Sequence, residues 1–123
     1  MQLKQIARDA LLKPLQSVSG IVERRHTLPI LANVLLESNE GRLFVTATDL
    51  EMQITAHVEF PGTEAQAVTV AARKLQDLLR ALPDDATLNV EATGNRMTVR
   101  AGRSRFNLQT LPAADYPRIN SSS

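Results

Sequence analysis

The sequence GRLFVTA at residues 41–47 decides the fold, because a related stretch, NRMTVRA, follows it 54 residues later at residues 95–101. Arginine, valine and alanine coincide in the two stretches, and their apolar positions alternate in phase. Such alternation is typical of a strand with one buried face. The recurrence predicts that the chain contains an internal duplication.

The elements around these two stretches follow the same order in both halves, namely a strand, a helix and three strands. Gly20 is expected to end the first helix, Pro14 to kink it, and Pro83 to stop the second. Tight turns are expected at residues 39–41 and 93–95. The pattern predicts an α+β fold built from a duplicated β-α-β-β-β unit, with two helices packed against antiparallel sheets. The helices are expected over residues 6–19 and 72–82, and the strands over 34–38, 43–48, 52–60, 67–70, 88–92, 96–100 and 104–111.

Composition limits the class of protein. With 123 residues the chain has the size of one domain, and its 43% hydrophobic and 3% aromatic content predicts an aliphatic core. Cysteine is absent, which suits a reducing cytosol and predicts a cytoplasmic protein without disulfides or thiolate metal sites. The N-terminus lacks the apolar run of a signal peptide, and no stretch approaches the roughly 20 apolar residues that span a bilayer.

The net charge of +1 hides an uneven distribution. Residues 1–29 carry five Lys/Arg and two acids, residues 30–64 carry one Arg and six acids, and residues 65–123 carry eight Lys/Arg and five acids. Phosphates respond to a local basic face and not to the bulk charge, so nucleic-acid binding stays open.

Motifs of catalysis and metal binding are missing from the sequence. The two histidines, His26 and His57, have no metal-ligand spacing, and the five glycines form no phosphate loop. A hydrolase would have to use Asp49, Glu51 and His57, without any spacing that supports it. We therefore expect a protein that binds and does not catalyse, with neither cofactor nor metal.

Basic residues provide the more informative signal. Four arginines lie between residues 96 and 105 without an acid among them, which fits either a solvated hairpin or an interface that grips carboxylates or phosphates. Arg73 and Lys74 open the second helix, where positive charge opposes the helix dipole. Arg24 and Arg25 occupy the segment after the first helix, expected to be an exposed loop.

Several blocks of the sequence resemble one family in order and spacing, the N-terminal domain of the bacterial DNA polymerase III β subunit, or sliding clamp. The resemblance runs from Leu11 to Pro117 and rests on LLKPL at 11–15, TLPIL at 27–31, TDLEM at 48–52, ARK at 72–74, GRSRF at 102–106 and TLPAADYP at 110–117.

This resemblance implies a DNA-clamp fold and a ring of two head-to-tail subunits, each with three similar domains, around duplex DNA. It implies that Arg25 and Arg73, with Arg24 beside them, face DNA without reading its sequence. It also implies a subunit interface facing acidic and apolar residues of a second clamp subunit, formed by Lys74, Arg96, Arg103, Arg105, Phe106 and Leu108. Polymerase and clamp loader are expected to bind other domains, absent from this chain.

The domain is assigned to residues 1–117, and residues 118–123 to the start of an interdomain linker. A small α+β nucleic-acid-binding module remains the alternative function. Such a module needs exposed aromatic residues for stacking, and the chain has only Phe44, Phe60, Phe106 and Tyr116.

Overall fold

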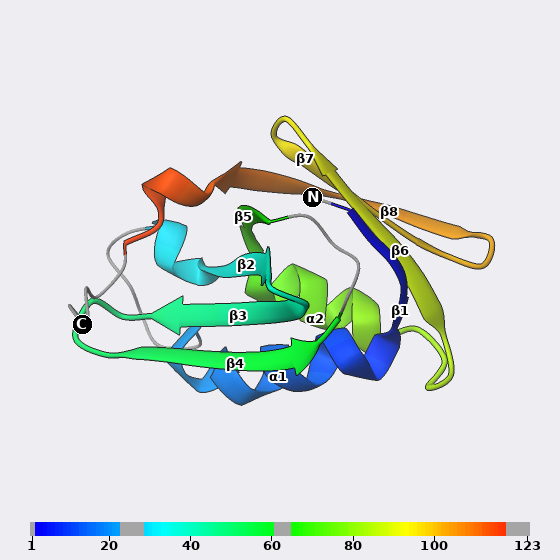
Figure 1. Cartoon of the computed structure of the whole chain (residues 1–123), viewed down its shortest axis with the longest axis horizontal. Helices are drawn as coiled ribbons and strands as arrows, with labels where there is room; N and C mark the ends of the chain where they lie inside the picture. Colours follow the sequence, from blue (N-terminus) through cyan, green and yellow to red (C-terminus); the bar gives the residue numbers. More distant parts are fainter. Residues whose placement is uncertain (1, 23–28, 61–64, 118–123) are drawn as a thin grey trace.

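The computed structural model describes residues 2–22, 29–60 and 65–117. Both halves contain a strand, a helix and three strands, which confirms the duplicated unit (Figure 1). The first half comprises β1 (Gln2–Ala7), α1 (Arg8–Val22), β2 (Asn33–Asn39), β3 (Arg42–Thr48) and β4 (Gln53–Glu59). The second comprises β5 (Gln66–Ala71), α2 (Ala72–Arg80), β6 (Thr87–Thr93), β7 (Arg96–Ala101) and β8 (Ser104–Pro112). Two short 3-10 helices, η1 (Pro29–Ala32) and η2 (Ala113–Asp115), precede β2 and follow β8.

The eight strands form one curled antiparallel sheet in the order β1-β6-β7-β8-β5-β2-β3-β4. The first strand of each half pairs with the other half, because β1 lies beside β6 and β5 lies beside β2. The duplicated stretches at 41–47 and 95–101 include most of β3 and all of β7, which occupy matching places in the two halves.

Both helices lie on one side of this sheet and pack against each other (Figure 1). α1 contacts β3 and β4, and α2 contacts β2, β5 and β8. The core between helices and sheet is aliphatic, as the composition predicts, with Leu15, Leu43, Leu75 and Met97 fully buried. The two 3-10 helices contact β2 and β5.

The prediction for the first helix was wrong at both ends. Residues 2–7 form a strand, and the helix begins at Arg8 and continues through Gly20 to Val22. Leu3 and Ile6 both point into the core although they are three residues apart, because a bulge places Gln5 in the left-handed region at φ 55°. Ile6 is buried and stands four residues before Ala10, which is a helical spacing and accounts for the early predicted start.

The remaining elements agree with the predictions to within two residues. Glu40 and Gly41 have positive φ in the turn between β2 and β3, and Gly94 has positive φ in the turn between β6 and β7. Pro14 lies inside α1 and is buried, so this helix lacks one backbone hydrogen bond in its first half.

Candidate nucleic-acid and subunit interfaces

The exposed side of the helix pair is rich in cations. α2 follows Ala71, whose side chain gives no cap, and buries Leu75 and Leu79 against the sheet. Arg73 and Lys74 are exposed in its first turn, as the sequence predicts. The exposed residues of the two helices are Lys13, Gln16, Ser17 and Gly20 on α1, and Arg73, Lys74, Asp77 and Arg80 on α2.

Sequence reasoning did not select Lys13 and Arg80. Both occupy the polar positions between buried residues of the helices, so the helical periodicity could have placed them on the same side as Arg73. Four cations and one acid, Asp77, therefore face solvent from the helix layer. The predicted DNA-facing residues Arg24 and Arg25 lie outside the described residues, as does His26.

The β7–β8 hairpin carries the other predicted residues. Arg96 on β7 and Arg105 on β8 are exposed, and Phe106 and Leu108 face the opposite, inner side, where they are half-buried against the core. Arg103 belongs to neither strand and lies in the tight turn before β8, directly after Gly102 at φ 57°.

The fold brings Lys74 of α2 and Leu108 of β8 to one pocket of about 350 Å³. Asn33, Asn95 and Thr110 also line it. The Thr110 hydroxyl is buried and has no hydrogen-bond partner among the described residues. Two residues assigned to the subunit interface, 34 positions apart in the chain, thus share one surface feature.

Arginines of the hairpin oppose one another across the strands. Arg100 on β7 pairs directly with Arg105 on β8, and Arg96 pairs with Gln109. Like charges placed directly opposite destabilise a sheet. Within the described part of the chain, none of Arg96, Arg100, Arg103 and Arg105 forms an ion pair.

Two of the three residues considered for a hydrolase, Asp49 and His57, make local side-chain contacts. An oxygen of the Asp49 carboxylate accepts hydrogen bonds from the backbone N–H groups of Glu51 at 2.9 Å and Met52 at 2.8 Å, which holds the turn between β3 and β4. The His57 ring lies 5.7 Å from the Phe44 ring on the outer face. Among the described residues, no group of three or more His, Cys, Asp or Glu could hold a metal ion. No described helix is long and apolar enough to cross a membrane.

A curled antiparallel sheet with two helices on one face, built from two copies of one unit, defines a clamp-type α+β domain. The chain belongs to the family of DNA polymerase III beta subunits, because residues 1–120 match the sequence model of that family's N-terminal domain. The beta sliding clamp of Vibrio cholerae is 51% identical over 115 residues, which cover 93% of this chain and 31% of the relative. The beta sliding clamp of Escherichia coli K12 is 52% identical over 116 residues, which cover 94% of this chain and 32% of the relative.

Solved structures agree with this assignment. The DNA polymerase III subunit beta of Pseudomonas aeruginosa superposes with a TM-score of 0.91 at 44% identity, over 99% of this chain and 33% of the other. The corresponding protein of Caulobacter crescentus gives a TM-score of 0.90 at 43% identity, over 98% of this chain and 32% of the other. The chain spans about a third of the length of these relatives.

Proposed function

We propose that this chain works as the first domain of a sliding clamp that encircles duplex DNA and gives the replicative polymerase its processivity. The observation that carries the proposal is the cationic face of the helix pair, in a domain that belongs to the β-subunit family. In this proposal the domain comprises residues 1–117, and residues 118–123 start the linker to a second domain. The protein acts in the cytoplasm, holds DNA without catalysing a reaction and needs no cofactor.

DNA passes the helix face, where Arg73 contacts phosphates together with Arg25 and Arg24. Contacts from long cationic side chains to a phosphate backbone carry no sequence information, so they permit sliding. Lys13 and Arg80 extend the same exposed face. The contacts are individually weak and screened by salt, and ring closure supplies the lasting attachment.

The DNA contact is tested by Arg73→Gln in a three-domain protein that carries this chain as its first domain. The logarithm of affinity for duplex DNA falls with the logarithm of salt concentration, and losing one phosphate contact lowers that slope by about one. Arg42→Gln, a change of the same charge on β3 at the outer face, is the control. Equal salt-dependence slopes for wild type and Arg73→Gln would show that Arg73 does not contact DNA.

The second surface is one half of a head-to-tail subunit interface. Arg96, Arg103 and Arg105 face acidic residues of the second subunit, and Lys74 does so at the 350 Å³ pocket. Phe106 and Leu108 supply the apolar contact on the inner side. One copy of this surface cannot close a ring, so the 123-residue chain alone is a folded monomer or only weakly self-associated, with little DNA affinity. Polymerase and clamp loader bind through other domains.

Charge reversal tests the interface. In the three-domain protein, the double variant Arg103→Glu and Arg105→Glu places glutamates against the acidic residues of the second subunit. The repulsion should shift the equilibrium from dimer toward monomer, which light scattering after size-exclusion chromatography measures. Arg80→Glu with Lys13→Glu, on the helix face, makes the same charge change and leaves dimerisation unchanged. An unchanged dimer for the hairpin variant would refute the assignment, and a closed ring formed by the 123-residue chain alone would refute the one-sided interface.

The alternative of a small nucleic-acid-binding module finds no stacking surface. Tyr116 is buried, Phe60 and Phe106 pack against the core, and Phe44 lies against His57, so no described phenylalanine or tyrosine side chain is exposed. Single-strand binding modules rely on exposed aromatic rings.

A further inference from the structure

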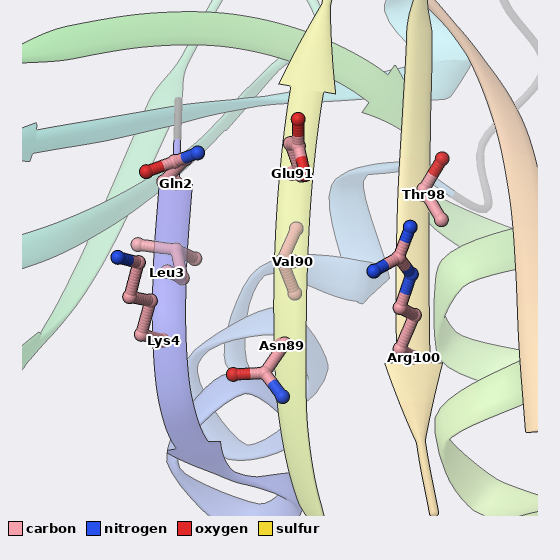
Figure 2. Close-up of a pocket in the computed structure, with 8 residues that line it drawn as sticks. All are labelled: Gln2, Leu3, Lys4, Asn89, Val90, Glu91, Thr98 and Arg100. Atoms are coloured by element: carbon pink, nitrogen blue, oxygen red, sulfur yellow. The ribbon is translucent and has the colours of Figure 1, made fainter. Parts of the chain in front are cut away.

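The outer face of the sheet carries a row of side chains that present only hydrogen-bond donors. Asn89 of β6 pairs with Arg100 of β7, and Arg100 pairs with Arg105 of β8. Lys4 of β1 lies on the other side of Asn89 (Figure 2). We call Lys4, Asn89, Arg100 and Arg105 the donor row.

Asn89 contributes a donor to this row because its oxygen is already used. The Asn89 side-chain oxygen accepts a hydrogen bond of 2.9 Å from the backbone N–H of Gln5, at the bulge in β1. Its NH2 group is therefore left to donate outward, between a lysine ammonium and an arginine guanidinium. Arg100 and Lys4 have no ion-pair partner within the part of the chain that the structure describes.

A pocket of about 210 Å³ opens over this part of the sheet, between β1, β6 and β7. The donor row forms one end, with Lys4, Asn89 and Arg100, and Gln2, Glu91 and Thr98 form the other (Figure 2). A ligand in the pocket would contact the donor groups of Lys4, Asn89 and Arg100 at one end and the carboxylate of Glu91 at the other.

We propose that this pocket binds an acidic peptide segment in an extended conformation, with its carboxylates on Lys4 and Arg100. Charge complementarity supports this occupant, since carboxylates match ammonium and guanidinium donors and relieve the repulsion between Arg100 and Arg105. Glu91 favours a peptide over a nucleic acid, because peptide N–H groups can donate to it while phosphates are repelled. None of the eight residues that line the pocket is aromatic, so bases have no stacking partner.

The experiment uses the 123-residue chain and a fluorescein-labelled hexaglutamate peptide, followed by fluorescence anisotropy at low salt. The peptide binds the wild type, Arg100→Gln weakens binding by about fivefold, and Lys4→Gln adds to the loss. Arg42→Gln removes the same charge from β3, outside the pocket, and leaves the affinity unchanged. Circular dichroism verifies that all variants are folded.

Four outcomes overturn the proposal. The first is no binding, and the second is an equal loss for Arg42→Gln and Arg100→Gln, which reports a general charge effect. The third is tighter binding of a phosphate-bearing probe, single-stranded DNA, with the same dependence on Arg100. The fourth is Arg100-dependent self-association in light scattering of the chain without peptide, which would assign the pocket to a second copy.

Discussion

The Tyr116 hydroxyl joins the end of the described chain to the end of β3, because it accepts a hydrogen bond of 3.0 Å from the backbone N–H of Thr48. The same hydroxyl donates to the carbonyl oxygen of Thr46 at 3.4 Å. Tyr116 is only 4% exposed, and its ring lies outside the main core cluster. The residue therefore fixes the segment after η2 to the sheet through one polar group.

Replacing Tyr116 with phenylalanine tests this attachment. The change keeps the ring and leaves the N–H of Thr48 buried without a partner, so the free energy of unfolding falls by about 1–2 kcal/mol. Urea denaturation measures the loss. Tyr116→Leu also removes ring packing and is expected to lose more. Equal stability of wild type and Tyr116→Phe would mean that the hydroxyl does not hold the segment.

Alkaline pH gives a second test of the same group. Burial raises the pKa of Tyr116 from 10.0 to about 12, and the hydrogen bond from Thr48 opposes that rise in part. Between these two values the unfolded chain releases a proton that the folded chain retains, so stability falls as pH rises. The loss attributable to this group approaches about 2 kcal/mol at pH 12. Between pH 10 and pH 12 the free energy of unfolding of the wild type should fall by about 2 kcal/mol relative to that of Tyr116→Phe. Parallel pH profiles of the two proteins would contradict this prediction.

Gly20 offers a stabilising substitution. It lies in the interior of α1, is exposed, and has no atom within 4 Å of the position a Cβ would take. Gly20→Ala should raise the free energy of unfolding by about 0.5–1 kcal/mol. Gly94→Ala is the matched control, because its site is equally open but has φ +62°, so alanine should destabilise it. Two changes of the same sign would show that backbone conformation does not decide the outcome.

Arg8 joins the start of α1 to the segment after α2. Its guanidinium donates to the carbonyl oxygen of Leu82 at 3.2 Å and lies 2.8 Å from Asp9 and 3.1 Å from Asp84. The side chain is 12% exposed, so Arg8→Ala should lower the free energy of unfolding by about 1–3 kcal/mol. Asp84→Ala is the control with almost no effect, since that carboxylate is 94% exposed. Thermal unfolding of both variants separates the buried contact from the surface ion pair.

The order of elements could be predicted because the apolar positions repeat in both halves. The prediction failed at the end of β1, where the strand residue Ile6 follows the bulge at Gln5, is buried and stands at a helical spacing from Ala10. A bulge depends on the partner strand, and local periodicity contains no information about that partner. The prediction that Gly20 ends the first helix was wrong for a related reason. The packing of α1 outweighs the low helix propensity of glycine, so the helix continues to Val22.

The candidate surfaces were predictable only where one strand or helix defines them. Alternation along β8 separates Arg105 from Phe106 and Leu108 without knowledge of the fold. The contact of Lys74 with the pocket beside Leu108 depends on how α2 crosses the sheet, and the opposition of Arg100 and Arg105 depends on register. The donor row also includes Lys4 of β1, which is remote in sequence from β6, β7 and β8, so no pattern along the chain could place it beside Asn89.

The pairing of the first strands of the two halves has a consequence for folding. Among the described strands, β1 pairs only with β6 of the second half, whereas β5 pairs with β8 of its own half and with β2 of the first half. A chain cut between β4 and β5 should therefore yield a first fragment whose β1 has lost its partner strand and a second fragment that keeps the pairing β6-β7-β8-β5. Mixing the fragments should restore the β1–β6 and β5–β2 pairings, and the uncut domain should unfold in a single cooperative transition.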